Sequence, residues 1–314
     1  MMRKLYISLL TLILVGLTLT TSVFAWFQVS RTGMIEGVEL GVALDDDLMI
    51  SLDGIDYYKD ISKEMLSSVI GPNPVLKNVT TQDGINFYQG PLAQSSRARP
   101  RTEYIAFDIH FRLTSDHPNS NYHQKYVYLS DRTNPTYQNA SQTKGTFITS
   151  MGRPWVNPIS FQNGMEIVPA GTNRVYYAKD AMRISARNAD ANEVFIYDVS
   201  QDRYRGFGKI FGAYDYYINR LGVSLDIPAE PEHTIYQLTE FSSLQNDIAL
   251  DKRSLLSELS LVSETEDIYV YEGKTTISIW LEGWDADAFD AILSDKLFMR
   301  LNIRSARFEE VING

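Results

Sequence analysis

The apolar and polar residues of this chain follow two different patterns. Residues 5–19 form one apolar run, which is interrupted only by small or polar residues, namely Ser8, Thr11, Gly16 and Thr18. From about Met34 onward, short stretches alternate between apolar and polar residues at every second position. Because successive side chains of a strand point to opposite faces, this second pattern predicts a series of half-buried strands.

The clearest strand is predicted for residues 104–113, where large apolar residues alternate with charged, polar and small ones. Its apolar side consists of Ile105, Phe107, Ile109, Phe111 and Leu113. Such alternation is typical of an antiparallel sheet with one face on the core. Further strands are predicted at residues 27–30, 34–42 with an irregularity at Gly37, 48–52, 125–130, 181–187, 193–198, 275–281 and 298–303. The segments 181–187 and 193–198 are expected to form a hairpin.

Helical spacing of apolar residues is limited to short segments. A helix is predicted at 60–70, because Ile61, Met65, Leu66 and Val69 share one face and Gly71 and Pro72 follow. Shorter helices are expected at 211–220, 242–250 and 287–293. Residues 131–175 are rich in Asn, Thr, Pro and Gly, which predicts long loops with one or two short strands.

Many short strands, separated by turns such as Asp53-Gly54 and Asp83-Gly84, predict an all-β fold. We expect an antiparallel β-sandwich with a few short helices. Residues 26–314 are predicted to form a single domain, with long insertions at about 131–175 and 206–265.

The apolar run near the N-terminus predicts export. Arg3 and Lys4 precede it, and the small residues required by signal peptidase occur in Val23-Phe24-Ala25, which places cleavage after Ala25. The run is also long enough to span a bilayer, so a retained anchor is an alternative, as is a buried core helix. Residues 1–25 are thus predicted to be a signal peptide or membrane anchor, and the protein to be extracellular or attached to the cell surface.

Composition narrows the classes of function. The chain of 314 residues has a formal net charge of −10 and no cysteine. An acidic protein is a poor ligand for a phosphate backbone, so no nucleic-acid partner is expected. The lack of cysteine excludes disulfides and thiolate metal sites.

No catalytic motif is present, since the chain contains neither HExxH nor GxSxG. A loose metal cluster of His110, His117 and His123 is an alternative to ordinary surface histidines. Two groups of carboxylates offer hard oxygen ligands for calcium, with ordinary loop solvation and helix capping as the other interpretation. The candidate calcium ligands are Asp45, Asp47, Glu282, Asp285 and Asp287.

Several segments together resemble a known family. They are VFAWFQVSR followed by GVELGV near the N-terminus, DGINFY at 83–88, YIAFDIHFRL, KYVYLS, and TISIWLEGWDADAFDAI near the C-terminus. The chain resembles the TasA and camelysin group of exported surface and biofilm-matrix fibre proteins, whose leaders are cut by a signal peptidase of the SipW type. Residues 131–175 and 206–265 show no such resemblance.

The resemblance implies a jelly-roll β-sandwich, secreted to the bacterial cell surface or extracellular matrix, whose subunits self-associate into filaments. In that family the N-terminal strand of one subunit can complete the sheet of the next. Here the donor would be residues 26–42, with the assembly residues Trp26, Phe27, Val29, Ile35, Val38, Leu40 and Val42. The peptidase activity described for camelysin-type members is not expected, because no metalloprotease motif is present.

We therefore expect a non-enzymatic structural protein, with contact to the membrane only through its N-terminal segment. One alternative is a carbohydrate- or ligand-binding surface module, with Trp155 and Trp284 as candidates for stacking on sugar rings. Another is a hydrolase that uses scattered histidines and carboxylates.

Overall fold

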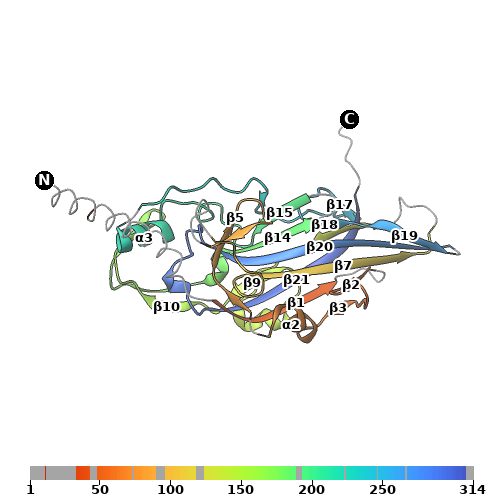
Figure 1. Ribbon diagram of the computed structural model, residues 1–314, viewed down its shortest axis with the longest axis horizontal. Helices are drawn as coiled ribbons and strands as arrows, with labels where there is room; N and C mark the ends of the chain where they lie inside the picture. Colours follow the sequence, from red (N-terminus) through yellow and green to blue (C-terminus); the bar gives the residue numbers. More distant parts are fainter. Residues whose placement is uncertain are drawn as a thin grey trace.

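The computed structural model describes residues 11, 33–42, 48–72, 74–89, 96–117, 124–188, 193–222, 224–245, 247–265 and 267–308. Two large β-sheets lie face to face and run along the long axis of the molecule (Figure 1). The fold is mostly β, as the alternating pattern predicts, and most strand pairs are antiparallel.

The first sheet has nine strands among the described residues. They are β2 (Leu48–Ser51), β5 (Asn78–Thr81), β6 (Phe87–Tyr88), β7 (Ile105–Ser115), β14 (Met182–Asn188), β15 (Glu193–Asp198), β16 (Thr234–Ile235), β19 (Ser260–Thr265) and β20 (Ile268–Glu282). The long strand β20 lies between β7 and β14 and is antiparallel to both. Strands β14 and β15 pair from Arg183↔Asp198 to Asn188↔Glu193, which confirms the predicted hairpin.

The second sheet has eight strands in the described part of the chain. They are β1 (Gly33–Val42), β3 (Asp60–Ile61), β4 (Val75–Leu76), β8 (Tyr126–Leu129), β9 (Phe147–Ser150), β17 (Ile248–Ala249), β18 (Leu255–Glu258) and β21 (Lys296–Phe308). Strand β21 is antiparallel to β8 and β9 and parallel to β1. The strands nearest the two ends of the chain are therefore neighbours.

The main core lies between the inner faces of the two sheets. The predicted apolar side of β7 is confirmed, since Ile105, Phe107, Ile109, Phe111 and Leu113 are all buried there. A second, smaller cluster covers the outer face of β20, where Phe87 and Tyr104 pack around the fully buried Trp280. The first sheet is thus covered on both faces near the end of β20.

Helices are few and short among the described residues. They are α2 (Lys63–Ile70), α3 (Ala213–Leu221), η3 (Tyr137–Gln142), η4 (Ala178–Ala181) and η5 (Asp290–Ile292). The predicted helix at 60–70 begins later than expected, because Asp60 and Ile61 pair with β1 as β3 and Ser62 caps the helix. In place of the helix predicted at 287–293, only the short η5 forms.

The helix predicted at 242–250 is wrong. Residues 243 and 244 form a bend, and the Ser242 amide donates a hydrogen bond to the Ile248 carbonyl at 2.9 Å. Ile248 and Ala249 then pair with the end of β21 as β17. Ile248 and Ala249 thus contact a distant strand, whereas Leu244 is exposed, and no helical face forms.

The insertion at 131–175 contains more strand than predicted. Besides β9, it holds β10 (Arg153–Val156), β11 (Phe161–Asn163), β12 (Glu166–Val168) and β13 (Asn173–Tyr176). Strands β10 and β13 form one small hairpin-like sheet, and β11 and β12 form another. With α3, which packs on β11, these strands form one end of the elongated molecule, at the left of Figure 1.

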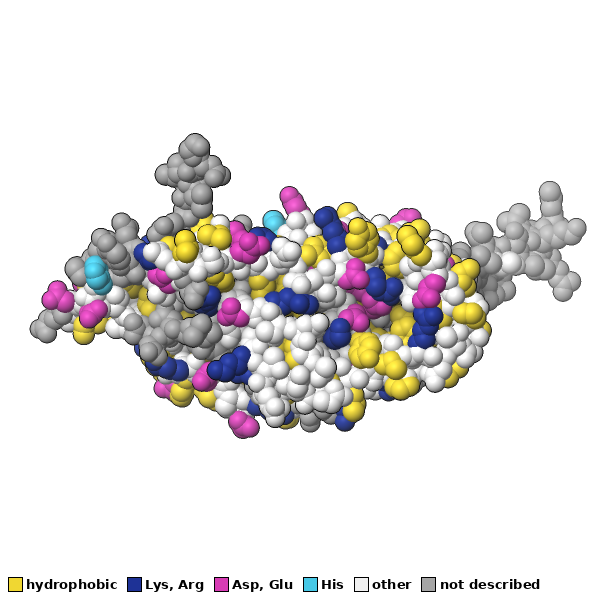
Figure 2. Space-filling model, turned by 180° about the vertical axis from the view of Figure 1, so that it is seen from behind, with side chains coloured by type: hydrophobic (Ala, Val, Ile, Leu, Met, Phe, Trp, Pro, Cys, Tyr) yellow, Lys and Arg dark blue, Asp and Glu magenta, His cyan; other side chains and the backbone are white. Residues whose placement is uncertain are grey.

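Among the described residues, no helix has both the length and the apolar character that a membrane crossing requires. On the face that Figure 2 shows, acidic and basic side chains are interspersed, without a continuous region of one sign.

Candidate functional site

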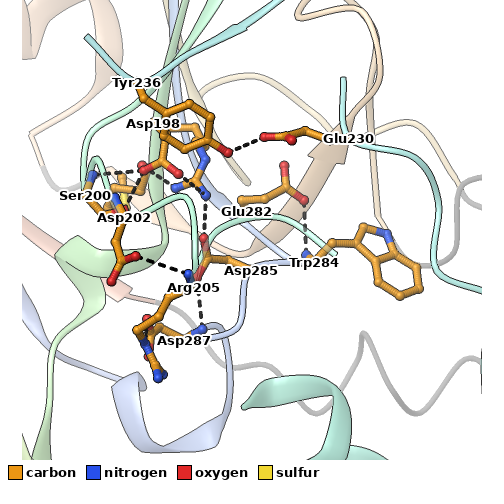
Figure 3. A network of polar contacts seen from close by, with 12 residues as sticks. Asp198, Ser200, Asp202, Arg205, Glu230, Tyr236, Glu282, Trp284, Asp285 and Asp287 are labelled. Carbon is orange, nitrogen blue, oxygen red and sulfur yellow. Dashed lines mark hydrogen bonds and ion pairs between the residues drawn. The ribbon is translucent and has the colours of Figure 1, made fainter. Parts of the chain in front are cut away.

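The residues proposed from the sequence fall into two regions. Glu282, Asp285 and Asp287 lie together at the end of β20, in a network of polar contacts (Figure 3). Ile35, Val38, Leu40 and Val42 belong to β1. Asp45, Asp47, Trp26, Phe27 and Val29 lie outside the described residues. Of the two tryptophans considered for stacking on sugar rings, Trp155 is half-buried, whereas Trp284 is 5% exposed and has no free face for a sugar.

Strand alternation builds the network on the outer face of the first sheet. In β14, Met182 and Ile184 enter the main core, so Arg183 between them points to the other face. Register pairs Arg183 with Asp198 of β15 and with Trp280 of β20. Glu282 follows Trp280 by two positions and lies on the same outer face. Three neighbouring strands thus each bring a charged group to one place.

Arg183 lies at the centre of this network. Its side chain is 2% exposed, and its Nη2 lies 2.8 Å from Asp198 Oδ2. It also forms an ion pair with Asp285, and Nη1 donates to the Met182 carbonyl. Burial alone would lower the pKa of Arg183, but the neighbouring Asp198 and Asp285 outweigh it and raise the pKa above its usual value. The guanidinium therefore stays charged inside the protein.

Three buried carboxyl groups, those of Asp198, Glu282 and Asp285, lie around the single guanidinium of Arg183. Glu282 accepts hydrogen bonds from Trp280 Nε1 at 2.9 Å and from the Trp284 amide at 3.1 Å. Burial raises the pKa of Asp198 and of Glu282, and it raises that of Asp285 well above its ordinary value. The charge of Arg183 lowers the pKa of each of these groups, but burial outweighs it, so ionisation of all three is opposed.

A tight turn closes the network from outside. Asp202 accepts hydrogen bonds from the amides of Tyr204 and Arg205, which shapes the turn before Gly206. A Cβ atom at Gly206 would lie 3.1 Å from Asp198 Oδ2 and 3.3 Å from the Tyr236 hydroxyl, so the turn packs directly on the charged groups.

Arg205 connects this turn to the insertion end of the molecule. Its Nε donates to Asp287 Oδ2 at 3.0 Å, its Nη2 also pairs with Asp287 Oδ1, and Nη2 donates to Asn163 Oδ1 of β11 at 2.8 Å. Asp287 lies two residues beyond Asp285, whose Oδ1 accepts the Asp287 amide at 2.9 Å. The ion pairs thus continue from the sheet to the small strands.

The three predicted calcium ligands that the structure describes are engaged by donors of the chain itself. Both oxygens of Glu282 accept bonds from tryptophans, both oxygens of Asp287 pair with Arg205, and Asp285 pairs with Arg183. The described residues hold no cluster of three or more carboxylate or histidine groups arranged around a metal position. Calcium binding at 282–287 would have to replace these bonds and stays a prediction.

Arg183, Asp198 and Arg205 were not among the residues singled out from the sequence. The signal for Arg183 and Asp198 is present in the hairpin, since both alternate with residues of the apolar side. The contact of Arg183 with Asp285 depends on tertiary folding, because the two residues are 102 positions apart.

The second region is the pairing of β1 with β21. The parallel register places Ile35, Val38, Leu40 and Val42 opposite Leu297, Met299, Leu301 and Ile303. These four residues of β21 are at most 1% exposed and belong to the main core. The register shifts between Ile35 and Gly37, which confirms the predicted irregularity. On its other side, β1 pairs over only two residues each with β3 and β4.

Comparison of the chain with known protein families, with curated proteins and with solved structures found no match.

Proposed function

We propose that this chain is a non-enzymatic structural protein, exported to the bacterial cell surface or extracellular matrix, that self-associates into filaments by exchanging its N-terminal strand. The observation that carries the proposal is the pairing of β1 with β21. In the proposed filament, β1 of one subunit occupies the place beside β21 of the next. The proposal includes a jelly-roll connection of the strands and a leader at 1–25.

Strand exchange is supported by how β1 is bound. Its long contact is with one neighbour, β21, and its other edge has two short pairings. A strand from a second copy would form the same main-chain hydrogen bonds and face the same core residues of β21. The two arrangements therefore differ little in contact energy.

A structural role is also supported by the charged network. Its buried carboxyl groups are engaged by Arg183, Arg205 and two tryptophans, and they connect β14, β15 and β20 to the turn at 202–206. Such an arrangement fixes strand ends and loops in place.

Electron microscopy of the purified protein tests the proposal. Residues 26–314 are expected to form filaments, whereas residues 43–314 are expected to form none. A synthetic peptide of residues 26–42 should bind the shortened protein and should also block assembly of the longer one. Purely monomeric 26–314 under all assembly conditions would refute the proposal.

A matched peptide controls for unspecific binding. It carries Val38→Asp and Leu40→Asp, which place charges opposite the buried Met299 and Leu301. This peptide is expected neither to bind nor to block assembly, because an unpaired charge is costly in the core. Equal action of both peptides would show that the pairing with β21 is not responsible.

A further inference from the structure

A cavity of about 500 Å³ lies at the insertion end of the molecule, between β10, α3 and the turn after η5. The residues that give it chemical character are Arg153 and Trp155 of β10, Tyr216 and Arg220 of α3, and Asp290. Ligand pockets in proteins measure roughly 300–1,000 Å³, so the volume suits a small molecule or one to two units of a chain.

The aromatic wall of the cavity is held in place from the core side. The Trp155 ring meets the rings of Tyr216, Phe289 and Tyr176 edge-on, with centroid distances of 5.7, 5.8 and 6.1 Å. Tyr216 and Phe289 are buried, whereas Trp155 is half-buried and lines the cavity. A rigid indole with part of its surface open is a stacking platform for the apolar face of a ring.

One arginine of the cavity is positioned by a carboxylate. Asp290 forms an ion pair with Arg220 and accepts hydrogen bonds from the hydroxyl groups of Tyr216 at 3.0 Å and Tyr217 at 3.1 Å. Arg220 Nη1 also donates to the Tyr216 hydroxyl at 3.1 Å. Asp290 thus has both oxygens occupied and fixes one side of the cavity.

The other arginine has no such counter-charge. Arg153 is half-buried at the cavity and has neither a hydrogen-bond nor an ion-pair partner among the described residues. Two guanidinium groups therefore face one carboxylate, which leaves the cavity with a local surplus of one positive charge. The whole chain carries −10, so this cavity differs from the average surface.

We propose that the cavity binds an acidic sugar residue of a glycan, in which a uronic acid ring stacks on Trp155 and its carboxylate pairs with Arg153. A guanidinium binds a carboxylate through two parallel hydrogen bonds, which gives both strength and orientation. The surplus of one charge matches a single carboxylate better than the several charges of a nucleotide. This inference is independent of strand exchange, since the cavity contains no residue of β1.

Titration calorimetry with the full chain tests the proposal, with digalacturonic acid as the probe and neutral digalactose as its uncharged counterpart. Digalacturonic acid is expected to bind at least about tenfold more tightly, because a charge-assisted pair is stronger than a neutral hydrogen bond. Arg153→Gln should remove this difference and leave weak binding of both sugars. Trp155→Phe, which keeps an aromatic ring in the core, should weaken both sugars alike.

Arg97→Gln is the matched control, because Arg97 is exposed and does not line the cavity. It should bind both sugars as the unchanged chain does. Absence of binding, equal affinity for the two sugars, or full affinity in Arg153→Gln would overturn the proposal. Acetate, inorganic phosphate or a nucleotide binding as tightly as digalacturonic acid would also overturn it, since the sugar ring would then play no part.

Discussion

At the level of single residues, Arg183 is the cation that compensates the buried carboxyl groups of the charged network. It offers one guanidinium to the buried Asp198 and Asp285, and its side chain is 2% exposed. We expect Arg183→Met to lower the free energy of unfolding by about 3–5 kcal/mol, because it leaves buried carboxyl groups without a cation. Urea unfolding followed by tryptophan fluorescence measures this change.

The half-exposed ion pair of Arg112 with Glu272 provides the comparison. Arg112→Met removes an equally long side chain from a place that water reaches, so its effect should be much smaller. Similar losses for the two variants would mean that Arg183 does not compensate buried charge.

The buried Asp285 predicts how stability depends on pH. Its pKa lies well above the ordinary 3.8, so the folded protein holds a proton that the unfolded chain releases as pH rises beyond that value. Stability therefore falls with rising pH, from the ordinary pKa up to the raised one. Asp285→Asn cannot release the proton, and its free energy of unfolding should fall less steeply as the pH rises above the ordinary value of 3.8. An unchanged slope in that range would contradict this assignment.

At the level of elements, α3 depends on two glycines with positive φ, one at each end of the helix. Gly212 before the helix has φ +66°, and Gly222 after it has φ +67°. A Cβ at Gly212 would lie 2.1 Å from the Ala286 carbonyl oxygen, whereas nothing lies within 4 Å of a Cβ at Gly222. The backbone of Gly222 is left-handed helical, with ψ 21°, whereas Gly212 has ψ −125°, a conformation that is open to glycine and strained for other residues. Gly212 therefore combines greater backbone strain with a clash.

Gly222→Ala is expected to cost about 1 kcal/mol through backbone strain alone. Gly212→Ala should cost about 1–3 kcal/mol more, since its backbone conformation is the more strained one and the backbone at Ala286 must also move. Thermal unfolding of both variants measures the difference. Equal melting temperatures would show that neither the backbone conformation at Gly212 nor its close approach to Ala286 adds to the cost.

The elements that are predicted well from the sequence are those whose pattern of apolar and polar residues reflects burial within the same segment. The alternation in 104–113 identifies β7 because its burial repeats every second residue. The helix prediction for 242–250 is wrong because the apolar residues of this segment do not share one buried face. Leu244 is 94% exposed, whereas Ile248 pairs with Arg307 of β21. Spacing alone cannot distinguish a helical face from contact with a distant strand.

At the level of the whole molecule, the two features that matter most had no local signal. The parallel pairing of β1 with β21 joins segments more than 250 residues apart. The amino-acid pattern of each strand predicts a strand, but it does not indicate which other strand it pairs with. Likewise, Asp285 and Asp287 resemble calcium ligands in the sequence, because the arginines that pair with them lie about a hundred residues earlier. Both features follow from tertiary contacts, so only the structure reveals them.

Disulfide crosslinking can test strand exchange, and because the chain contains no cysteine, only the introduced cysteines can form a bond. Glu39 of β1 and Arg300 of β21 are register partners, so cysteines at these positions lie side by side in a paired strand. We expect an equimolar mixture of Glu39→Cys and Arg300→Cys to give crosslinked dimers after oxidation, as seen by non-reducing gel electrophoresis. The bond can form there only when β1 of one copy reaches β21 of another.

The double variant Glu39→Cys/Arg300→Cys distinguishes the two arrangements within one sample. Strands retained in their own subunit give a crosslinked monomer, whereas exchanged strands give a ladder of covalent oligomers that reduction dissolves. Glu39→Cys mixed with Lys274→Cys, whose position on β20 belongs to the other sheet, should give no such product. A crosslinked monomer alone, with no dimer in the mixture of single variants, would mean that β1 stays with its own β21 and that filaments require another contact.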